Sequence, residues 1–482
     1  MLFRKKPPIE AAWEKAQKLL QAGKTAEAEG ALTDALKSTP TNSEAYFSGV
    51  EYLATVQFLG NMPDRSMQTL MEGCEQPEPT DEAARKQRLT LFMNAGELLL
   101  RQGRYEEAQE LLQRGLEGRE SFYGKSHSGY AFGLEPLADV TLALGQHPEA
   151  MALYEQTLAI FQKDRHPRAL GTLARVLLCQ KLTSPETNPY ETATMEKAAW
   201  EEVAETTIGL ANQLPNGICA PAIWDLQKQL AIQLGEGHAM RETALILLSN
   251  LEREAKRPTG SQKALKLLSN LYHGQRKLEP MLDAMMGLAM AQSEGGDHEG
   301  AQATYRDVAE RAIKYNKPAA QIRALHNQGL HLAEIDRRDE AEVALRQAVA
   351  LNGGVSSSRA KVALGIFLQH GGNLTEAAPL LEEALKELPP DAPDTFPARN
   401  HLKAIKENRS CGCGDGVGAI SEGFQAFLDT QLPQEFQGIV KVDFEGESLQ
   451  VHVERELKDD EAERLNLVIQ HALAAYLTRM TS

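Results

Sequence analysis

The fold of this chain is decided by a short stretch, Gly103-Arg-Tyr-Glu-Glu-Ala108. Its glycine suits a tight turn, and its alanine stands early in the helix that we expect to follow. A turn residue followed five positions later by alanine recurs along the chain. Self-similarity of this kind predicts stacked pairs of helices. The other occurrences are Gly23/Ala28, Gly145/Ala150, Gly296/Ala301, Asp336/Ala341 and Gly372/Ala377.

A second pattern supports the first. A small residue precedes each turn in the first helix of the pair, where only a small side chain lets two helix backbones approach closely. A large apolar residue follows each alanine by four positions, and Pro40 and Pro389 stand where a second helix has to stop. The small residues are Ala16, Gly96, Ala138, Ala289, Gly329 and Gly365, and the large ones are Leu32, Leu112, Tyr154, Tyr305, Leu345 and Leu381.

Together these features resemble the tetratricopeptide repeat over about residues 10–160 and 280–390. The resemblance implies a mostly α fold, an α-solenoid in which antiparallel helix pairs form a superhelix. It also implies a concave groove that binds protein segments. The step from Gly103 to Gly145 is 42 residues, and the intervening segment 118–128 resembles the repeats of kinesin light chains.

The middle of the chain, residues 161–279, is less regular. Apolar periodicity predicts helices over 166–182, 191–213, 218–235, 238–257 and 262–274, and a further helix over 278–293. The polar segment 183–189 is expected to be a loop. Arg276 and Gly296 offer competing repeat registers. We interpret this region as degenerate repeats within one continuous solenoid, 1–408, and the alternative is a separate helical spacer between two repeat blocks.

The composition changes after Pro389. A helix from Phe396 to about Asn408 is expected to cap the array, with Arg399, Lys403 and Lys406 facing water. A linker rich in cysteine and glycine, 409–418, then separates the solenoid from a small α+β domain at 419–482. The expected order of this domain is α-β-β-α, with helices at 419–431 and 460–480. It resembles no family that we can name.

The strands of this domain are predicted from alternating apolar residues. A two-residue turn at Gly446-Glu447 pairs Phe444 with Leu449, and the same register pairs the valines on either side. Those pairs are Val442 with Val451 and Val440 with Val453. All six apolar side chains then share one face, which the two helices have to cover, because a lone hairpin is only marginally stable.

Composition narrows the function. The net charge of −16 argues against a nucleic acid as partner, because phosphate binding requires basic surfaces. No apolar stretch reaches the ~18 residues that span a membrane. The basic start of the chain lacks the apolar region of a secretory signal. Five cysteines in 482 residues are too few for a disulfide framework, so the cytoplasm is the expected location.

Candidate binding residues follow from the resemblance. In tetratricopeptide repeats the first helix lines the groove, and its second and sixth positions often contact the ligand. These positions are Arg323 and Asn327, Arg359 and Ala363, and Thr90 and Asn94. Two arginines over an amide suit a carboxylate or an acidic peptide. This resembles the carboxylate clamp of chaperone-binding repeats, although the lysines and second asparagine of that clamp are not matched.

Chemistry is sparse elsewhere. Cys411 and Cys413 stand in the glycine-rich linker and form a candidate metal or redox pair, although two thiolates rarely complete a metal site. Cys74, Cys179 and Cys219 are expected to pack inside helices. The sequence therefore predicts a non-enzymatic adaptor without a cofactor, which binds a protein or peptide in the groove. The alternative is a thiol- or metal-dependent protein with the repeats as a docking arm. A ligand-sensing regulator is a weaker third possibility.

Overall fold

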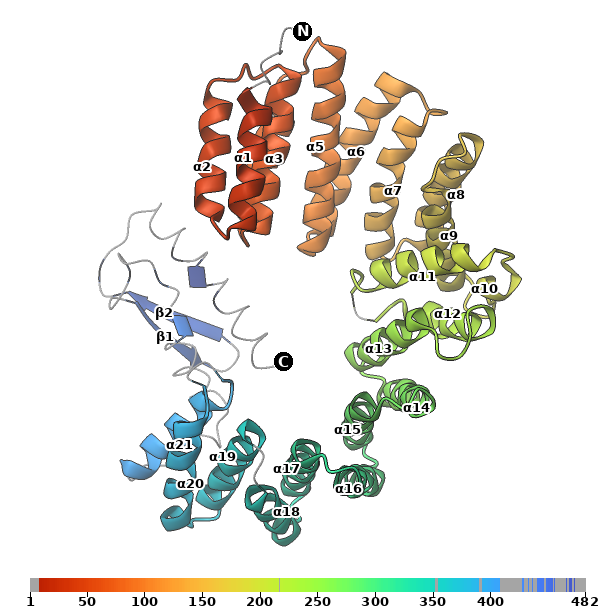
Figure 1. Ribbon diagram of the computed structural model, residues 1–482. Coiled ribbons are helices and arrows are strands. Elements are labelled where there is room, and N and C mark those ends of the chain that lie inside the picture. The colour runs from red at the N-terminus through yellow and green to blue at the C-terminus, as the bar shows by residue number, and fades with distance from the viewer. Residues whose placement is uncertain are drawn as a thin grey trace. The chain divides into compact units, whose positions relative to one another are not determined.

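The protein is a succession of helices followed by a small hairpin (Figure 1). The computed structural model describes residues 8–215, 217–351, 354–389 and 392–407. Beyond residue 407 it describes residues 427–428, 432, 436, 440–445, 448–453, 455, 465, 468–469 and 472. The chain divides into two compact units, Met1–Gln275 and Arg276–Ser482.

The first unit consists of antiparallel helices. Along most of the unit, each helix packs on the next helix in the sequence. Its helices are α1 (Pro8–Gln21), α2 (Thr25–Lys37), α3 (Glu44–Leu59), α4 (Pro63–Cys74), α5 (Glu82–Arg101), α6 (Tyr105–Tyr123), α7 (Ser128–Ala143), α8 (His147–Lys163), α9 (Ala169–Thr183), α10 (Pro189–Thr192), α11 (Lys197–Ala211), α12 (Ala220–Gln233), α13 (Ala239–Glu254) and α14 (Pro258–Gly274).

The described residues of the second unit form three helix pairs, a capping helix and two strands. Its elements are α15 (Leu278–Glu294), α16 (His298–Lys314), α17 (Pro318–Glu334), α18 (Arg338–Ala350), α19 (Val355–His370), α20 (Leu374–Glu387), α21 (Thr395–Lys406), β1 (Val440–Glu445) and β2 (Ser448–Val453).

The predicted turn residues end the first helix of each pair in the same way. Gly103 has φ +74° and Asp336 has φ +59°, the left-handed conformation that favours glycine and tolerates aspartate. The next residue closes the turn: the amide of Arg104 donates to the carbonyl of Leu99 at 3.0 Å. This bond satisfies a carbonyl that the helix end would leave without a partner. Gly23, Gly145, Gly296 and Gly372 share the positive φ.

Close packing between the two helices of a pair explains the small residues. A Cβ atom added to Gly96 would lie 2.3 Å from Cγ of Leu112, sixteen residues further along. Gly329 meets Leu345 and Gly365 meets Leu381 in the same way. Each glycine of the first helix thus accepts the large apolar side chain that the sequence pattern placed on the second.

Two helix pairs were missed in the sequence because their turns lack both glycine and alanine. Asn61 and Lys256 have φ +59° and +54°, and serine replaces the alanine five positions later in each case. The hydroxyl of Ser66 donates to the carbonyl of Ala54 at 2.8 Å, and that of Ser261 donates to the carbonyl of Ser249 at 3.1 Å. These bonds join the two helices of α3/α4 and of α13/α14 where alanine would otherwise pack.

The turns become periodic from α13 onward. Positive φ occurs at Lys256, Arg276, Gly296, Asn316 and Asp336, which is every twentieth residue. Arg276 and Gly296 are therefore both turns, one between pairs and one within a pair. The competing registers in the sequence reflect two consecutive turns of the same kind.

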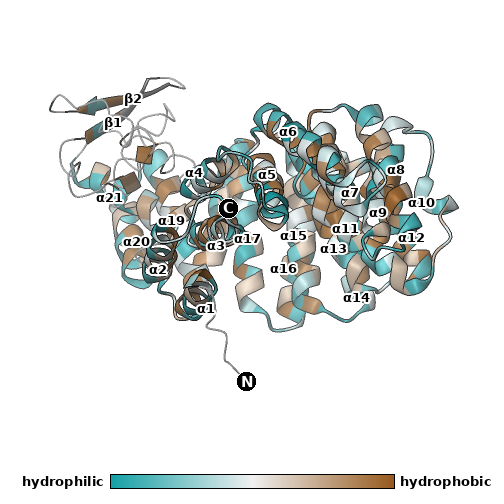
Figure 2. Cartoon of the chain, turned by 90° about the horizontal axis from the view of Figure 1, so that it is seen from above, coloured by the Kyte–Doolittle hydropathy of each residue, from teal (hydrophilic) through white to brown (hydrophobic). Residues whose placement is uncertain are grey.

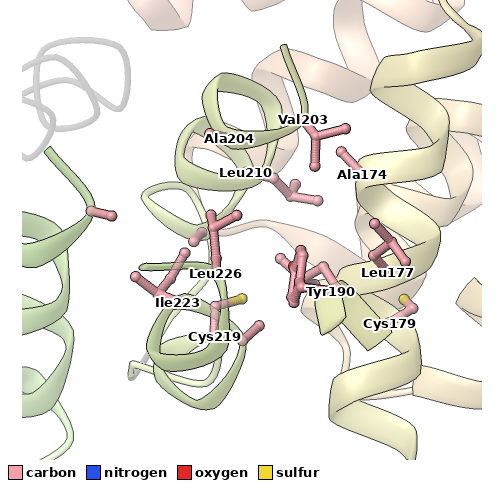
Figure 3. Close-up of a cluster of buried hydrophobic side chains, with 14 of the residues drawn as sticks. Ala174, Leu177, Cys179, Tyr190, Val203, Ala204, Leu210, Cys219, Ile223 and Leu226 are labelled. Atoms are coloured by element: carbon pink, nitrogen blue, oxygen red, sulfur yellow. The ribbon is translucent and has the colours of Figure 1, made fainter. Parts of the chain in front are cut away.

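The irregular middle has the expected helices, with one addition. The short helix α10 forms at the end of the segment expected to be a loop. One apolar cluster runs from Ala138 of α7 to Ala264 of α14 and includes Tyr190 and Trp200 (Figure 3). Because this cluster joins α7 and α8 to the middle helices, the first unit continues its packing through the irregular segment as far as α14. Whether one solenoid continues over 1–408 stays a prediction.

The C-terminal elements agree with the expected register where they are described. β1 and β2 are antiparallel, with Val440 opposite Val453, Val442 opposite Val451, and Phe444 opposite Leu449. Val440 and Val442 are buried, whereas Val451 is exposed. The turn at 446–447 and most of the two flanking helices lie outside the described residues. Helix α21 caps α19 and α20, and Arg399, Lys403 and Lys406 are exposed as expected.

The helices carry both hydrophobic and hydrophilic residues (Figure 2). Among the described residues, no helix combines the length and the apolar character needed to cross a lipid bilayer.

We predict opposite effects for alanine at two helical glycines of the first unit. Gly96→Ala should lower the melting temperature, because the new methyl group overlaps Leu112 and overpacking costs about 1–3 kcal/mol. Gly30→Ala should raise it, because nothing lies within 4 Å of the added atom and alanine favours a helix by roughly 0.5–1 kcal/mol. Calorimetry of both variants checks the pair, and a Gly96→Ala protein as stable as the wild type contradicts the packing.

A second prediction concerns acid and the capping helix. Burial, and to a smaller extent the charge of His370, lowers the pKa of His401 in α21 to about 4. The unfolded chain binds this proton below its ordinary pKa of 6.5, so the folded state loses stability as the pH falls from 6.5 to 4. At 1.36 kcal/mol per pKa unit the upper limit of this loss is roughly 3 kcal/mol, and solvent screening of a partly buried group makes the loss smaller.

Hydrogen exchange of α21 at several pH values measures this loss. His401→Gln serves as control, because glutamine does not titrate and the protein then retains only the acid sensitivity of its carboxylates. Equal acid sensitivity in both proteins would rule out His401 as the cause.

Candidate functional site

One face of each unit is formed by the first helices of the pairs. In the first unit α1, α3, α5 and α7 contact one another in succession, and in the second unit α15, α17, α19 and α21 do the same. The second helices pack behind them. We call this the inner-helix face of each unit. The side chains that project from it are the candidates for partner contact.

In the second unit the predicted arginines lie on this face and are paired within the chain. Nη2 of Arg323 lies 2.7 Å from Oδ1 of Asp283 on α15, and Nε of Arg359 lies 2.8 Å from Oδ2 of Asp394 before α21. The structure therefore does not present two free guanidinium groups side by side. The pair of Arg323 is exposed, and that of Arg359 is exposed at the arginine and half-buried at Asp394. Exposed ion pairs contribute about 0–1 kcal/mol, so a partner carboxylate can compete with these acids.

The neighbours of these arginines are less polar. Asn327, one turn after Arg323, is half-buried and makes no side-chain hydrogen bond within the described part of the chain. His326 lies between them on α17. Burial lowers the pKa of His326, with Asp394 opposing and Arg359 adding to the effect, and its Nδ1 has no hydrogen-bond partner among the described residues.

Asn94, the predicted groove residue of the first unit, belongs to a pocket. Its Nδ2 donates to Oε1 of Glu51 at 3.1 Å, and Gln87 donates to the other oxygen of the same carboxylate. The pocket, about 210 Å³ in volume, lies among α3, α4 and α5. Its lining includes Glu51, Phe58, Leu70, Asn94, Glu97, Leu98 and Arg101.

A polar network crosses α7, α8 and α9 next to this pocket. Glu135, 6% exposed, lies 3.2 Å from Arg168 and accepts a hydrogen bond of 2.9 Å from Thr172. Asp139 is 3.0 Å from Nε of Arg175 and accepts a 2.5 Å hydrogen bond from Tyr154. Sequence analysis missed this network, although its acids and bases lie one repeat apart, a spacing that was available as a signal.

The described thiols offer no reactive site. Cys74, Cys179 and Cys219 are buried and free, and burial raises the pKa of each to about 12. Cys179 and Cys219 point into the apolar cluster near Tyr190 (Figure 3), as packing residues do. Cys411 and Cys413 lie outside the described residues. In the part of the chain that is described, no three histidine, cysteine or acidic side chains gather as metal ligands would.

Comparison with known families gives three matches, each to the tetratricopeptide repeat. They cover residues 87–163, 283–312 and 326–393. The first includes the signature at Gly103, and the third includes Asp336 and Gly372. No match was found among the curated proteins with which the chain was compared.

Solved structures that resemble the chain include a putative kinesin light chain from Podosopora anserina with nearly identical TPR-like repeats, and its Q17M variant. Each is 14% identical with a TM-score of 0.28, and the match covers 57% of this chain and all of the other. The TPR domain of P58(IPK) is 15% identical with a TM-score of 0.23, covering 83% of this chain and 97% of that domain.

The polar network generates a prediction about stability. Arg175→Met should destabilise the first unit by about 3–5 kcal/mol, because Asp139 would lose its partner cation and Glu135 would keep only Arg168. Arg104→Met removes an exposed pair with Glu107 and should cost less than about 1 kcal/mol. Urea unfolding followed by tryptophan fluorescence reports on this region through Trp200. Equal stabilities of the two variants would show that the network carries little energy.

Proposed function

Because the chain is a tetratricopeptide-repeat protein, we propose that it is a non-enzymatic scaffold in the cytoplasm that binds a partner protein or peptide along its inner-helix face. The support is the arrangement of exposed, weakly paired charged groups on consecutive first helices. Repeats of this family generally serve protein–protein interaction. A stack of helix pairs offers one extended surface rather than an enclosed cavity, which suits an extended segment.

For the second unit, the proposed contact surface is Arg323, Asn327 and Arg359, and the proposed ligand is an acidic or C-terminal segment. A carboxylate that replaces Asp283 or Asp394 keeps the charge pairing and adds contacts of its own. Asn327, with its amide unengaged, supplies hydrogen-bond donors one helical turn away. Asn94 marks the corresponding surface in the first unit.

The thiol- or metal-dependent alternative depends on Cys411 and Cys413 and stays a prediction. Elemental analysis and brief alkylation of the reduced protein test it directly. Bound zinc, iron or copper, or rapid labelling of these two thiols, would favour it.

The scaffold function is tested with short fluorescent peptides that are rich in aspartate and glutamate and end in a free carboxylate. We expect the full chain to bind them, and Arg323→Glu/Arg359→Glu to weaken binding at low salt, where such contacts are strongest. Arg306→Glu/Lys314→Glu changes the net charge equally on α16 of the same unit and serves as control. Circular dichroism confirms that each variant remains helical. Equal affinity of the test variant and the wild type at low salt would rule out this surface.

A further inference from the structure

The pocket of the first unit has an apolar wall and a buried floor. Phe58 and Leu59, at the end of α3, are 40% and 63% exposed, which is high for large apolar side chains. Leu70 of α4 and Leu98 of α5 close the pocket from below and are buried. Its volume of about 210 Å³ is smaller than the ~300–1,000 Å³ of small-molecule pockets, so it suits one or two side chains of a larger partner.

Two carboxylates face this pocket without a cation of their own. Glu51 is held by the amides of Asn94 and Gln87, which are neutral donors that fix its orientation but leave its charge. Glu97 makes no ion pair or side-chain hydrogen bond within the described part of the chain. Burial raises the pKa of Glu97; Asp139 and Glu135 raise it further, and Arg101 and Arg168 oppose them only in part.

The negative field extends across α3. Burial raises the pKa of Tyr52, and Glu51, Glu10 and Glu44 raise it further. After burial, the charges of these three acids are the further causes of the raised pKa, so their negative charges act on the same side chain of α3.

Arg101, a cation that lines the same pocket, contacts an aromatic ring instead of a carboxylate. Arg101 follows Glu97 by one helical turn, a spacing that permits an ion pair. Instead, its guanidinium lies over the ring of Phe58, 5.7 Å from the centroid. The arginine thus covers part of the apolar wall and, within the described residues, forms no ion pair with either carboxylate.

We propose that this pocket binds a partner segment in which a lysine or arginine stands next to a large apolar residue. The cation reaches Glu97 and Glu51, and the apolar side chain packs on Phe58, Leu59 and Leu98. Binding of this kind compensates two charges that the fold leaves unpaired and removes exposed apolar surface in the same step. The proposal rests on the proposed function, since it uses the same inner-helix face, and it assigns to the first unit a ligand of opposite charge to that of the second.

The test uses the full chain and three fluorescent peptides that differ only at the two key positions: lysine–leucine, glutamate–leucine and lysine–serine. We expect the first to bind, and the other two to bind at least about tenfold more weakly, because either the charge or the apolar contact is missing. Free lysine and a polyamine serve as competitors. Competition by either at concentrations comparable to the peptide would show a simple amine site and would overturn the peptide proposal.

Three variants define the site. Glu97→Gln should reduce affinity for the lysine–leucine peptide about tenfold, while Glu106→Gln, the same change on the exposed face of α6, should leave it unchanged. Arg101→Gln should increase affinity, because it removes a competing cation from the rim and uncovers Phe58. A gain of binding cannot arise from unfolding, so this variant keeps the proposal falsifiable even if Glu97→Gln were to disturb the fold. Unchanged affinity in both variants overturns it.

The outcomes separate this inference from the function on which it rests. If the acidic peptides bind the second unit and the lysine–leucine peptide does not bind, the scaffold function stands and the assignment of this pocket is wrong. If neither class of peptide binds, both are wrong. Arg323→Glu/Arg359→Glu should leave binding of the lysine–leucine peptide unaltered, and a loss there would contradict the assignment to the first unit.

Discussion

The close approach of two helices at a residue without a side chain is the contact on which the rest of the structure depends. At Gly96, Gly329 and Gly365 a leucine side chain of the second helix packs directly against the backbone of the first helix. Any larger residue at these positions would overlap the leucine. The contact fixes how the two helices cross. It also turns the first helices toward one another, so that successive pairs stack through α3, α5 and α7 or through α15, α17 and α19. An inner-helix face exists because this contact recurs.

Polar contacts act at a different level, between successive pairs. Asp283 and Arg323 occupy equivalent positions, each thirteen residues before its turn residue, and they form an ion pair across one repeat. Asp139 and Arg175, Glu299 and Arg337, and Ser293 and His331 are likewise joined over 36 to 38 residues. Apolar packing thus holds each pair together, and polar groups fix the register of one pair against the next, as expected for an array with nearest-neighbour coupling.

Much of the fold could be predicted from sequence because its determinants are local. The turn glycines, the small residues opposite large ones and the hairpin register all follow from short spacings, and the structure has them as expected. The helix pairs with turns at Asn61 and Lys256 were not predicted, because their turn residue is not glycine and the repeat pattern requires alanine five positions later. Both pairs have serine at that position, and its hydroxyl makes a hydrogen bond to the first helix. Asparagine tolerates the left-handed conformation of these turns, whereas at Lys256 tertiary packing imposes it against the local preference of the residue.

The sequence could predict where the candidate binding residues lie, but not whether their charges are paired within the chain. The family resemblance predicted that Arg323 and Arg359 lie on first helices, and they lie on α17 and α19. Whether a charged side chain is free, however, depends on which neighbour it meets one repeat away. Arg323 meets an acid at the equivalent position of the preceding repeat, whereas Glu97 meets two further acids, and its nearest arginine lies on an aromatic ring. The predicted contact residues of the second unit therefore lie in exposed ion pairs, whereas Glu97 of the first unit is a carboxylate without an ion pair among the described residues, and no sequence motif marks it. Under the two proposals, a partner displaces an intrachain acid in the second unit, whereas in the first unit it meets carboxylates that form no ion pair in the part of the chain that is described. The two proposed sites therefore differ in the work that binding requires.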